Sequence, residues 1–420
     1  MHILWLKTEL LHPVDKGGKI RTYQMLKELK RDHHITYLTL DDGTAGSGAR
    51  EKATEYCHDL ISITHTTAAK FSAAFYSELA SNLLSPLPYA IKKYESTQMR
   101  DCVSQLVSER NFDVVVCDFL APAVNLPDGF AFPTVLFEHN VEAMIWRRHF
   151  EVQINPVKRK YLRGQWRKMD AFERRMCRQF DTVIAVSAED RMMIEQEYGA
   201  TSVYDVPTGV DTEFFRPGGK VLSKPGNLVF TGSMDWLPNE DAIRYFTEQI
   251  LPLIKREVPE VTLTVVGRNP SPSLLELSKQ DNSIIVTGRV GDVRPYIEGG
   301  SAYIVPLRIG GGTRLKIYEA MAMEKAVIST SVGAEGLPVR NGEELLLADS
   351  PVEFARLAVK VLKDKALAAG LGQRAAKTVR ESFGWGRVAA EFVAICQRTA
   401  ARNKTQRSDY ATPLPMASGK

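Results

Sequence analysis

The chain has few cysteines, no long apolar run and almost no excess of charge. Its 5 cysteines among 420 residues are widely scattered, without a CxxC pair or a Cys/His spacing typical of zinc sites. We expect them to be small buried side chains in a reducing compartment. No stretch approaches the roughly 18 uncharged apolar residues of a membrane-spanning helix. The first residues also lack the apolar segment of a secretory signal, so we expect a cytoplasmic protein.

What is present is the composition of an ordinary globular protein, with 44% hydrophobic and 25% charged residues. A length of 420 residues exceeds one hydrophobic core and suits two domains of roughly 100 to 200 residues each. Short apolar runs alternate with longer amphipathic stretches in two series, the pattern of β-α units in parallel sheets. We therefore predict an α/β protein with two Rossmann-like, doubly wound domains that face a central cleft.

The turn-rich segment 206–217 breaks this periodicity and marks the predicted domain boundary. We expect domains over 1–205 and 206–384, a last helix over 385–400 that returns towards the first domain, and a disordered tail over 401–420. Strands are predicted at 3–6, 35–40, 60–63, 114–117, 135–137, 182–186, 228–231, 263–266, 284–286, 302–305 and 327–330. Helices are predicted at 20–30, 98–110, 156–178 and 188–198, and from 239, 273, 313, 352 and 367 onward.

One segment concentrates positive charge. From Arg147 to Arg178 there are 11 Lys or Arg residues against 3 acidic ones, and apolar side chains interleave with them at helical spacing. The pattern predicts one or two basic amphipathic helices. It is compatible with a solvated helix face, or with a surface for anionic headgroups or a pyrophosphate-linked lipid acceptor. No nucleic-acid-binding motif accompanies it, so we expect no nucleic-acid partner.

The most informative run is 308–322, where three glycines follow a predicted strand and open a helix. Glycines let backbone N–H groups approach an anion, and a helix N-terminus adds partial positive charge. Arg314 and Lys316 could neutralise a diphosphate, and Glu319 could accept hydrogen bonds from ribose hydroxyls. A surface ion pair between Lys316 and Glu319 is the structural alternative, but it does not account for the glycines. We predict a nucleotide-diphosphate site here.

Other candidate residues also follow predicted strands, at the edge of a parallel sheet where ligands bind. Gly17 and Gly18 could approach a phosphate or sugar, or could be turn residues only. His139 lies in a polar cluster, and we interpret it as a substrate contact. The remaining seven histidines (His2, His12, His33, His34, His58, His65 and His149) fit surface or core positions.

Three further strand ends carry weaker signals. Gly232 and Ser233 could lie against a phosphate, with a structural turn as the alternative. Glycine-containing strand ends at 266–268 and 287–290 could bring backbone groups to a base edge.

Taken in order, these residues resemble the family 4 retaining glycosyltransferases of the GT-B fold. The resemblance runs from Ile3 to the last predicted helix. It rests on the Gly17-Gly18 turn, the strand end at His139, the segment 206–217 and the run 311–322. The sequences EHNVE and GGGTRLK are similar to those of a subgroup of bacterial polysaccharide-cluster enzymes.

The resemblance implies a metal-independent hexosyltransferase with an acceptor domain at 1–205 and a donor domain at 206–384. It would move a sugar, with retention, from a nucleotide-diphosphate donor to a glycan or lipid-linked acceptor in cell-surface polysaccharide synthesis. UDP is preferred over GDP from family frequency, and no cofactor is implied. Catalysis is expected from His139, Arg314 and Lys316. Donor binding is expected from Gly17, Gly18, Gly232, Ser233, Gly267, Arg289, Val290, Gly311, Gly312, Thr313, Leu315 and Glu319. The basic segment would give peripheral contact with the inner face of the membrane.

Two positions depart from the family pattern. Gly311 stands where relatives carry the first of two glutamates, and Ser233 stands where many carry an arginine. Sugar contacts would then fall to backbone amides of Gly311, Gly312 and Thr313, and the cationic charge to Arg314 and Lys316. The departures keep two alternatives open: a nucleotide-sugar epimerase of similar fold, and a non-catalytic nucleotide-sugar-binding scaffold.

Overall fold

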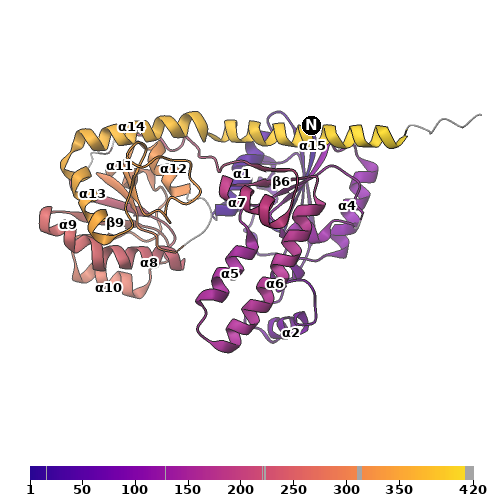
Figure 1. Cartoon of the computed structure of the whole chain (residues 1–420), viewed down its shortest axis with the longest axis horizontal. Coiled ribbons are helices and arrows are strands. Elements are labelled where there is room, and N and C mark those ends of the chain that lie inside the picture. Colours follow the sequence, from indigo (N-terminus) through magenta and orange to yellow (C-terminus); the bar gives the residue numbers. More distant parts are fainter. Residues whose placement is uncertain (16, 128, 220, 222–223, 310–314, 412–420) are drawn as a thin grey trace, which may run out of the picture. The chain divides into compact units, whose positions relative to one another are not determined.

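The chain forms two compact units, Met1–Pro207 with Val388–Lys420, and Thr208–Arg387. They are seen in a computed structural model that describes residues 1–411 apart from 16, 128, 220, 222–223 and 310–314, with only the backbone of 403–411. Each unit contains one sheet flanked by helices (Figure 1). The contact-based boundary at Pro207 lies beside the boundary at 205–206 that the turn residues predicted.

The first unit is built on a seven-stranded parallel sheet in the order β3-β2-β1-β4-β5-β6-β7. The strands are β1 (His2–Lys7), β2 (His34–Asp41), β3 (Asp59–Thr64), β4 (Val114–Asp118), β5 (Thr134–Phe137), β6 (Thr182–Ala185) and β7 (Val203–Asp205). Every residue of β4, β5 and β6 is buried. Helices cover both faces of these central strands, which explains why their sequences are continuous apolar runs and not alternating ones.

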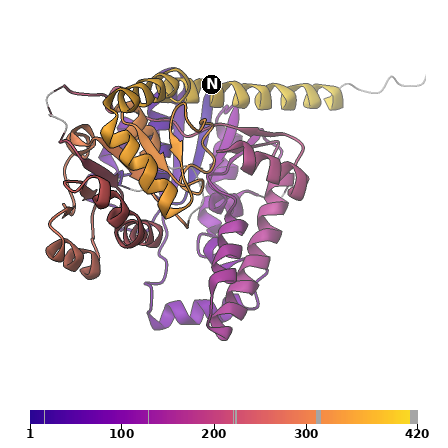
Figure 2. The same ribbon diagram turned by 60° about the vertical axis from the view of Figure 1, so that its left-hand side comes forward.

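The structure describes eight α-helices in the first unit, and a side chain caps the N-terminus of four of them. They are α1 (Gly17–Leu29), α2 (Ala73–Asn82), α3 (Tyr89–Lys92), α4 (Thr97–Glu109), α5 (Glu142–Val152), α6 (Pro156–Gln179), α7 (Ala188–Met193) and α15 (Trp385–Ala411). Before α6, the Asn155 side chain accepts hydrogen bonds from two backbone N–H groups, and Pro156 occupies the first turn. Helices α5 and α6 lie side by side and project from the sheet, with α2 beside α6 (Figures 1 and 2).

The C-terminal helix α15 belongs to the first unit from Val388 onward. The Phe392 ring packs 5.6 Å from Trp5 and 5.1 Å from Phe137, centroid to centroid. The helix continues to Ala411, past residue 401 where the polar composition predicted a disordered tail to begin. The reason is that no proline or glycine interrupts the sequence between Gly386 and Pro413.

The second unit has a six-stranded parallel sheet in the order β10-β9-β8-β11-β12-β13. Its strands are β8 (Asn227–Thr231), β9 (Thr262–Val266), β10 (Ile284–Val286), β11 (Ala302–Val305), β12 (Val327–Ser329) and β13 (Leu346–Leu347). Its helices are α8 (Leu237–Tyr245), α9 (Leu251–Glu257), α10 (Pro272–Gln280), α11 (Arg294–Gly299), α12 (Leu315–Ala322), α13 (Pro351–Lys363) and α14 (Lys365–Ser382). Two apolar clusters, one on each face, hold the sheet between its helices.

None of the helices that the structure describes combines the length and the apolar character that crossing a bilayer requires.

Candidate functional site

Each sheet reverses its strand order once, between β1 and β4 in the first unit and between β8 and β11 in the second. In doubly wound sheets, ligands bind in the crevice at the carboxyl ends of the strands that flank this reversal. Most of the candidate residues that the structure describes lie at or near the carboxyl ends of strands in these two sheets.

In the first unit, Asp118 is the centre of a buried polar network. It ends β4, and it lies opposite the end of β1, where Lys7 stands. Its Oδ2 accepts hydrogen bonds from Lys7 Nζ at 2.9 Å, Thr22 Oγ1 at 2.6 Å and Trp5 Nε1 at 3.0 Å. Both members of the Lys7–Asp118 pair are buried. The network joins β1, β4 and α1 at the point where the strand order reverses.

His139 approaches the other oxygen of this carboxylate. Its Nε2 lies 2.6 Å from Asp118 Oδ1, although the ring N–H is not aligned for a well-formed hydrogen bond. Neither ring nitrogen has a hydrogen-bond partner among the described residues, and the side chain is only 2% exposed. A buried imidazole in this state can still bind a ligand, because its hydrogen-bonding capacity is unused.

The electrostatics of this network favour a neutral histidine. Desolvation lowers the pKa of His139 to about 3, against the opposing attraction of Asp118. Burial also opposes ionisation of Asp118, but the Lys7 charge and the His139 contact hold the pKa of Asp118 well below its usual range. We therefore assign an ionised Asp118 paired with Lys7, and a neutral His139 that can donate or accept one hydrogen bond near pH 7.

The Phe119 ring covers His139 and explains Gly18. It stacks on the imidazole with 3.8 Å between ring centroids, and Phe119 itself has a left-handed backbone with φ of 73°. A Cβ on Gly18 would lie 2.8 Å from the Phe119 ring, whereas one on Gly17 would meet nothing within 4 Å. Gly18 is thus required by packing, and Gly17 leaves open space at the start of α1.

A cavity of about 260 Å³ adjoins this network. Its lining includes Lys7, Glu9, Phe119 and Glu142. Desolvation raises the pKa of the Glu142 carboxyl to about 7, so this group is partly protonated at neutral pH. The first unit therefore presents a pocket with a neutral histidine, a cation and a weakly acidic carboxyl nearby.

In the second unit, two glycines allow the backbone to pass very close at the ends of β8 and β9. A Cβ on Gly267 would lie 1.7 Å from the Gly232 carbonyl oxygen. A Cβ on Gly232 would lie 2.7 Å both from Asn239 Nδ2 and from Lys316 Nζ. Only glycine fits at either position, so both have a structural role in shaping this edge of the sheet.

Lys316, in the first turn of α12, reaches this edge. Its Nζ donates a 2.9 Å hydrogen bond to Asn239 Oδ1 and lies 4.1 Å from the centroid of the Phe230 ring. The Asn239 amide in turn donates to the Ser233 carbonyl oxygen at 2.8 Å. The structure thus brings together Gly232, Ser233 and Lys316, three of the residues that the sequence predicted for the diphosphate.

Arg268 adds a cation that the sequence analysis did not assign. It follows β9, and its Nε donates a 2.8 Å hydrogen bond to Ser233 Oγ. Arg268 is therefore a further candidate, beside Arg314 and Lys316, for the charge missing at Ser233. A guanidinium reaches the same place from the neighbouring strand. Arg308, in contrast, forms a bidentate pair with Asp241 at 2.6 and 3.0 Å, which holds the end of β11 to α8.

Glu319 lies one turn after Lys316 on α12 and is half-buried. Desolvation raises the pKa of its carboxyl to about 7, and the Lys316 charge opposes this shift. Leu315, which was also predicted to bind the donor, is the first residue of α12 and is half-buried too. At pH 8 most of the Glu319 carboxyl is ionised and able to accept hydrogen bonds.

Two of the residues predicted to bind the donor, Arg289 and Val290, are not members of either cluster. Arg289 is exposed, and Val290 packs against the apolar core of the second unit. Gly311, Gly312, Thr313 and Arg314 lie outside the described residues.

Four members of the first network were not predicted from the sequence: Trp5, Lys7, Thr22 and Asp118. One signal was available: Lys7 and Asp118 are charged residues that directly end strands of otherwise apolar residues. A charge at the carboxyl end of a buried parallel strand is costly unless it is paired, so two of them in one sheet suggest partners.

Two family models match the chain. Residues 16–214 match the model described as Glycosyltransferase Family 4, and residues 225–364 match the model described as Glycosyl transferases group 1. Together the two matches span both units.

Curated relatives are distant. An uncharacterized 44.6 kDa protein in the cps region of Klebsiella pneumoniae is 26% identical over 145 residues, which are 33% of this chain and 37% of that protein. The lipopolysaccharide core biosynthesis mannosyltransferase LpcC of Rhizobium leguminosarum bv. viciae is 23% identical over 60% of this chain and 74% of its own length.

Solved structures match over nearly the whole chain. Sucrose-phosphate synthase from Thermosynechococcus elongatus has a TM-score of 0.70 at 15% identity, covering 96% of this chain and 99% of that one. Anabaena Alr3699/HepE in complex with UDP has a TM-score of 0.63 at 13% identity, covering 96% and 100%. At these identities the likeness concerns the fold, which is GT-B, as the sequence predicted.

Proposed function

Because the chain belongs to the family 4, group 1 glycosyltransferases, we propose that it is a retaining hexosyltransferase of bacterial cell-surface polysaccharide synthesis. The donor is a nucleotide-diphosphate sugar, and the acceptor is a glycan or a lipid-linked glycan. UDP is the preferred nucleotide, since the similar fold of Alr3699/HepE has been solved with UDP and with UDP-glucose. Synthesis of surface polysaccharide is favoured by the names of the cps-region relative and of LpcC.

The observation that carries this proposal is the convergence of Lys316, Arg268 and close-packed glycine backbone at the ends of β8 and β9. In the reaction, the bond between the anomeric carbon and the diphosphate breaks, and the diphosphate keeps the electron pair. Lys316 and Arg268 stabilise that developing charge, with Arg314 as a further cation. No metal ion is required in this proposal, because positive side chains do this work.

The acceptor side of the reaction uses the first unit. The acceptor hydroxyl oxygen bonds to the anomeric carbon, and its proton passes to the departing phosphate oxygen, so no protein nucleophile takes part. His139, held neutral beside Asp118, orients a sugar hydroxyl, and Gly17 leaves room for the substrate. Backbone amides of Gly311, Gly312 and Thr313 contact the donor sugar in place of the missing glutamate. The anomeric configuration of the product, read by NMR, checks retention.

Donor binding tests the function directly. We expect UDP-sugars, screened beside GDP-sugars at pH 8, to raise the thermal midpoint and to release UDP when an acceptor is added. Glu319→Ala should weaken donor affinity about 10- to 100-fold, because hydrogen bonds from ribose hydroxyls to a charged carboxylate contribute about 1.5–3 kcal/mol. Exposed Glu381→Ala in α14 serves as the control, with wild-type affinity expected.

The other two functions give different results in the same assay. An epimerase would change the donor sugar without releasing the nucleotide. A scaffold would bind the donor and show no turnover with any acceptor. Wild-type donor affinity in Glu319→Ala would show that the ribose is bound elsewhere.

We also propose that the α5–α6 pair contacts an anionic membrane. At the turn between these helices, three apolar side chains are largely exposed: Val152 by 76%, Ile154 by 93% and Val157 by 77%. Lys158, Arg159 and Lys160 follow directly and are exposed as well. Apolar side chains rimmed by cations suit insertion into the headgroup region of a bilayer, where each cation contributes about 1 kcal/mol. This arrangement favours the membrane interpretation over a merely solvated helix face.

Vesicle flotation separates the electrostatic contribution of the cations from the contribution of the exposed apolar side chains. Charge reversal at Lys158, Arg159 and Lys160 should abolish most binding to vesicles that contain anionic lipid, and Ile154→Ser should weaken binding at high salt, where the electrostatic part is screened. Lys377→Glu and Val352→Ser, both exposed and in the second unit, are matched controls. Equal flotation of the wild type and the charge-reversed protein would contradict the proposal.

A further inference from the structure

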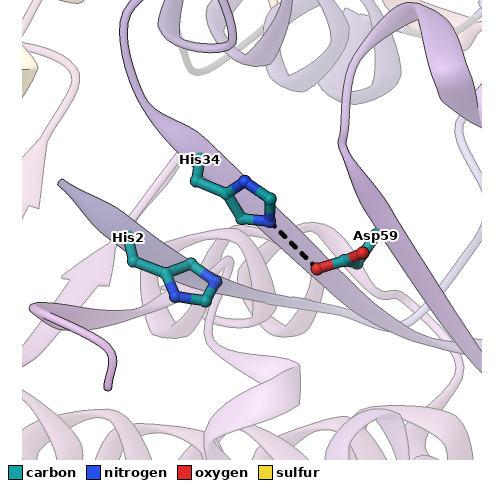
Figure 3. A group of neighbouring side chains, drawn as sticks. All are labelled: His2, His34 and Asp59. Carbon is teal, nitrogen blue, oxygen red and sulfur yellow. Dashed lines mark hydrogen bonds and ion pairs between the residues drawn. The ribbon is translucent and has the colours of Figure 1, made fainter. Parts of the chain in front are cut away.

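A second polar cluster lies at the opposite edge of the first sheet, where β1, β2 and β3 begin. His2 is the first residue of β1, His34 the first of β2 and Asp59 the first of β3. The three strands are neighbours in parallel register, with His2 opposite His34 and Thr36 opposite Asp59. The side chains of His2, His34 and Asp59 point toward one another (Figure 3). The proposed reaction does not use this edge of the sheet.

The three side chains offer metal ligands in close proximity. One nitrogen from each imidazole and one carboxylate oxygen all lie within 4.8 Å of one another. Among the described residues, no other group of three or more His, Cys, Asp or Glu side chains meets this distance. In a tetrahedral site, zinc–ligand bonds of about 2.0–2.2 Å place the ligand atoms about 3.4 Å from one another. Small side-chain rotations bring the three ligand atoms to that distance.

Both ring nitrogens of His2 have polar neighbours, which decide the side on which its lone pair lies. Its Nδ1 lies 3.2 Å from the Asn111 carbonyl oxygen, which can only accept a hydrogen bond. That contact assigns the proton to Nδ1 and leaves the lone pair on Nε2, which lies 3.0 Å from the oxygen of Thr36, whose hydroxyl donates to Asp59 Oδ2. A backbone carbonyl that binds the outer N–H of a histidine is the usual support for a metal ligand.

The protonation states also suit a cation. Desolvation and the nearby His34 lower the pKa of His2, so its imidazole is neutral near pH 7. Hydrogen bonds from His34 and Thr36, together with Arg110, lower the pKa of Asp59, so its carboxylate is ionised despite some desolvation. Asp59 therefore brings one negative charge to the cluster and His2 brings a neutral imidazole, the states in which these two groups bind metals.

Two neighbours compete with a metal ion. Arg110 NH1 lies 3.3 Å from Asp59 Oδ2, and the Thr36 hydroxyl donates a 3.2 Å hydrogen bond to the same oxygen. The Arg110 side chain is 43% exposed, so it can swing into solvent when a divalent ion takes its place. His58 stacks on His34 with 4.6 Å between ring centroids, but its Nδ1 already accepts a hydrogen bond from the Ile35 backbone N–H.

We propose that His2, His34 and Asp59 form a binding site for a divalent transition-metal ion of the Zn²⁺ class. Two imidazole nitrogens and one carboxylate oxygen supply three ligands, and water completes a tetrahedron. The bound ion links the starts of three neighbouring strands. It thereby fastens β3, an edge strand whose residues are only half-buried or exposed. The site acts on the stability of the first unit and takes no part in sugar transfer.

The test uses the full chain without a histidine tag, stripped with a chelator and titrated with Zn²⁺ or Co²⁺ at pH 7.5. We expect one ion per chain, a higher thermal midpoint that EDTA reverses, and a visible absorption of tetrahedral Co²⁺. His34→Gln and Asp59→Asn should each weaken Zn²⁺ binding by at least about tenfold. Arg110→Gln should strengthen it, because a competing cation is removed. His149→Gln, an exposed histidine on α5, is the matched control and should bind like the wild type.

Zn²⁺ affinity that is unchanged in both His34→Gln and Asp59→Asn would overturn the proposal, as would the absence of binding in the wild type and in Arg110→Gln. If the ligand variants fail to fold, histidine NMR of the wild type decides: Zn²⁺ should shift the His2 and His34 resonances and leave His149 unchanged. A shift of other histidines only would also contradict the site. Donor turnover should be the same with and without Zn²⁺ at a temperature where both forms are folded.

Discussion

Replacing Asp118 with alanine is expected to unfold or severely destabilise the first unit. The substitution removes the acceptor for the buried Lys7 ammonium, the Thr22 hydroxyl and the Trp5 indole N–H. Removing one partner of a buried, hydrogen-bonded ion pair costs about 3–5 kcal/mol, because the other charge is left without compensation. This is a large share of the stability of a typical domain, about 5–15 kcal/mol. Hydrogen exchange of the β1 and β4 amides measures the loss within this unit.

Two further variants test whether the loss of stability comes from the uncompensated Lys7 charge. Asp101→Ala changes an exposed aspartate on α4 in the same unit, and it should leave exchange unchanged. The double variant Lys7→Met with Asp118→Leu should recover part of the stability, because an apolar pair replaces the buried ions. Wild-type protection in Asp118→Ala would show that the network contributes little to the fold. A double variant no more stable than Asp118→Ala would mean that Lys7 is not the group left uncompensated.

Replacing Lys316 with alanine is expected to reduce turnover by about 10²–10³-fold, with a smaller effect on donor affinity. The reason is that negative charge grows on the diphosphate as its bond to the sugar breaks, so a fixed cation stabilises the transition state more than the bound donor. Lys316 Nζ is held for this task by Asn239 and by the face of the Phe230 ring. Steady-state kinetics with a nucleotide sugar, interpreted through kcat and KM, measures the effect.

The controls for this prediction separate charge from structure. Lys377→Ala removes an exposed lysine of α14 in the same unit and should keep wild-type kinetics. Arg268→Ala should also lower turnover, because its guanidinium reaches Ser233 at the same edge of the sheet. Wild-type turnover in Lys316→Ala, with a folded protein, would show that the leaving group is stabilised by other residues. An increase of KM alone would place Lys316 in donor binding and not in the chemical step.

The order of elements was predictable from sequence because buried parallel strands carry a strong local signal. Continuous apolar runs such as 114–117 and 302–305 leave no solvated face, and both are central strands of the structure. Strands β7 and β13 were not predicted, because they are short edge strands whose position depends on the neighbour they pair with. Helix α2 was missed for a similar reason: it has little amphipathic pattern, and its end is held by Gln165 of α6.

The candidate sites were also predictable from the sequence only in part. The glycine positions Gly232 and Gly267 were visible in the sequence, because only glycine permits such a close approach of two backbone segments. The partners that give these positions their chemistry were not visible. Arg268 reaches Ser233 across 35 residues, and Asp118 meets Lys7 across 111.

The sequence by itself determined the two-unit α/β fold, the family and the sheet edges that carry the candidate residues. These properties follow from the local periodicity of hydrophobic residues. They also follow from residues such as the glycines after strands, whose role can be recognised without knowing their neighbours in space. The tertiary structure alone decided which charges meet: the Lys7–Asp118–His139 network, the Arg268–Ser233 contact and the His2–His34–Asp59 cluster. The physical reason is that parallel strands far apart in sequence begin and end at common edges. Their terminal side chains become neighbours only when strand order and register are set.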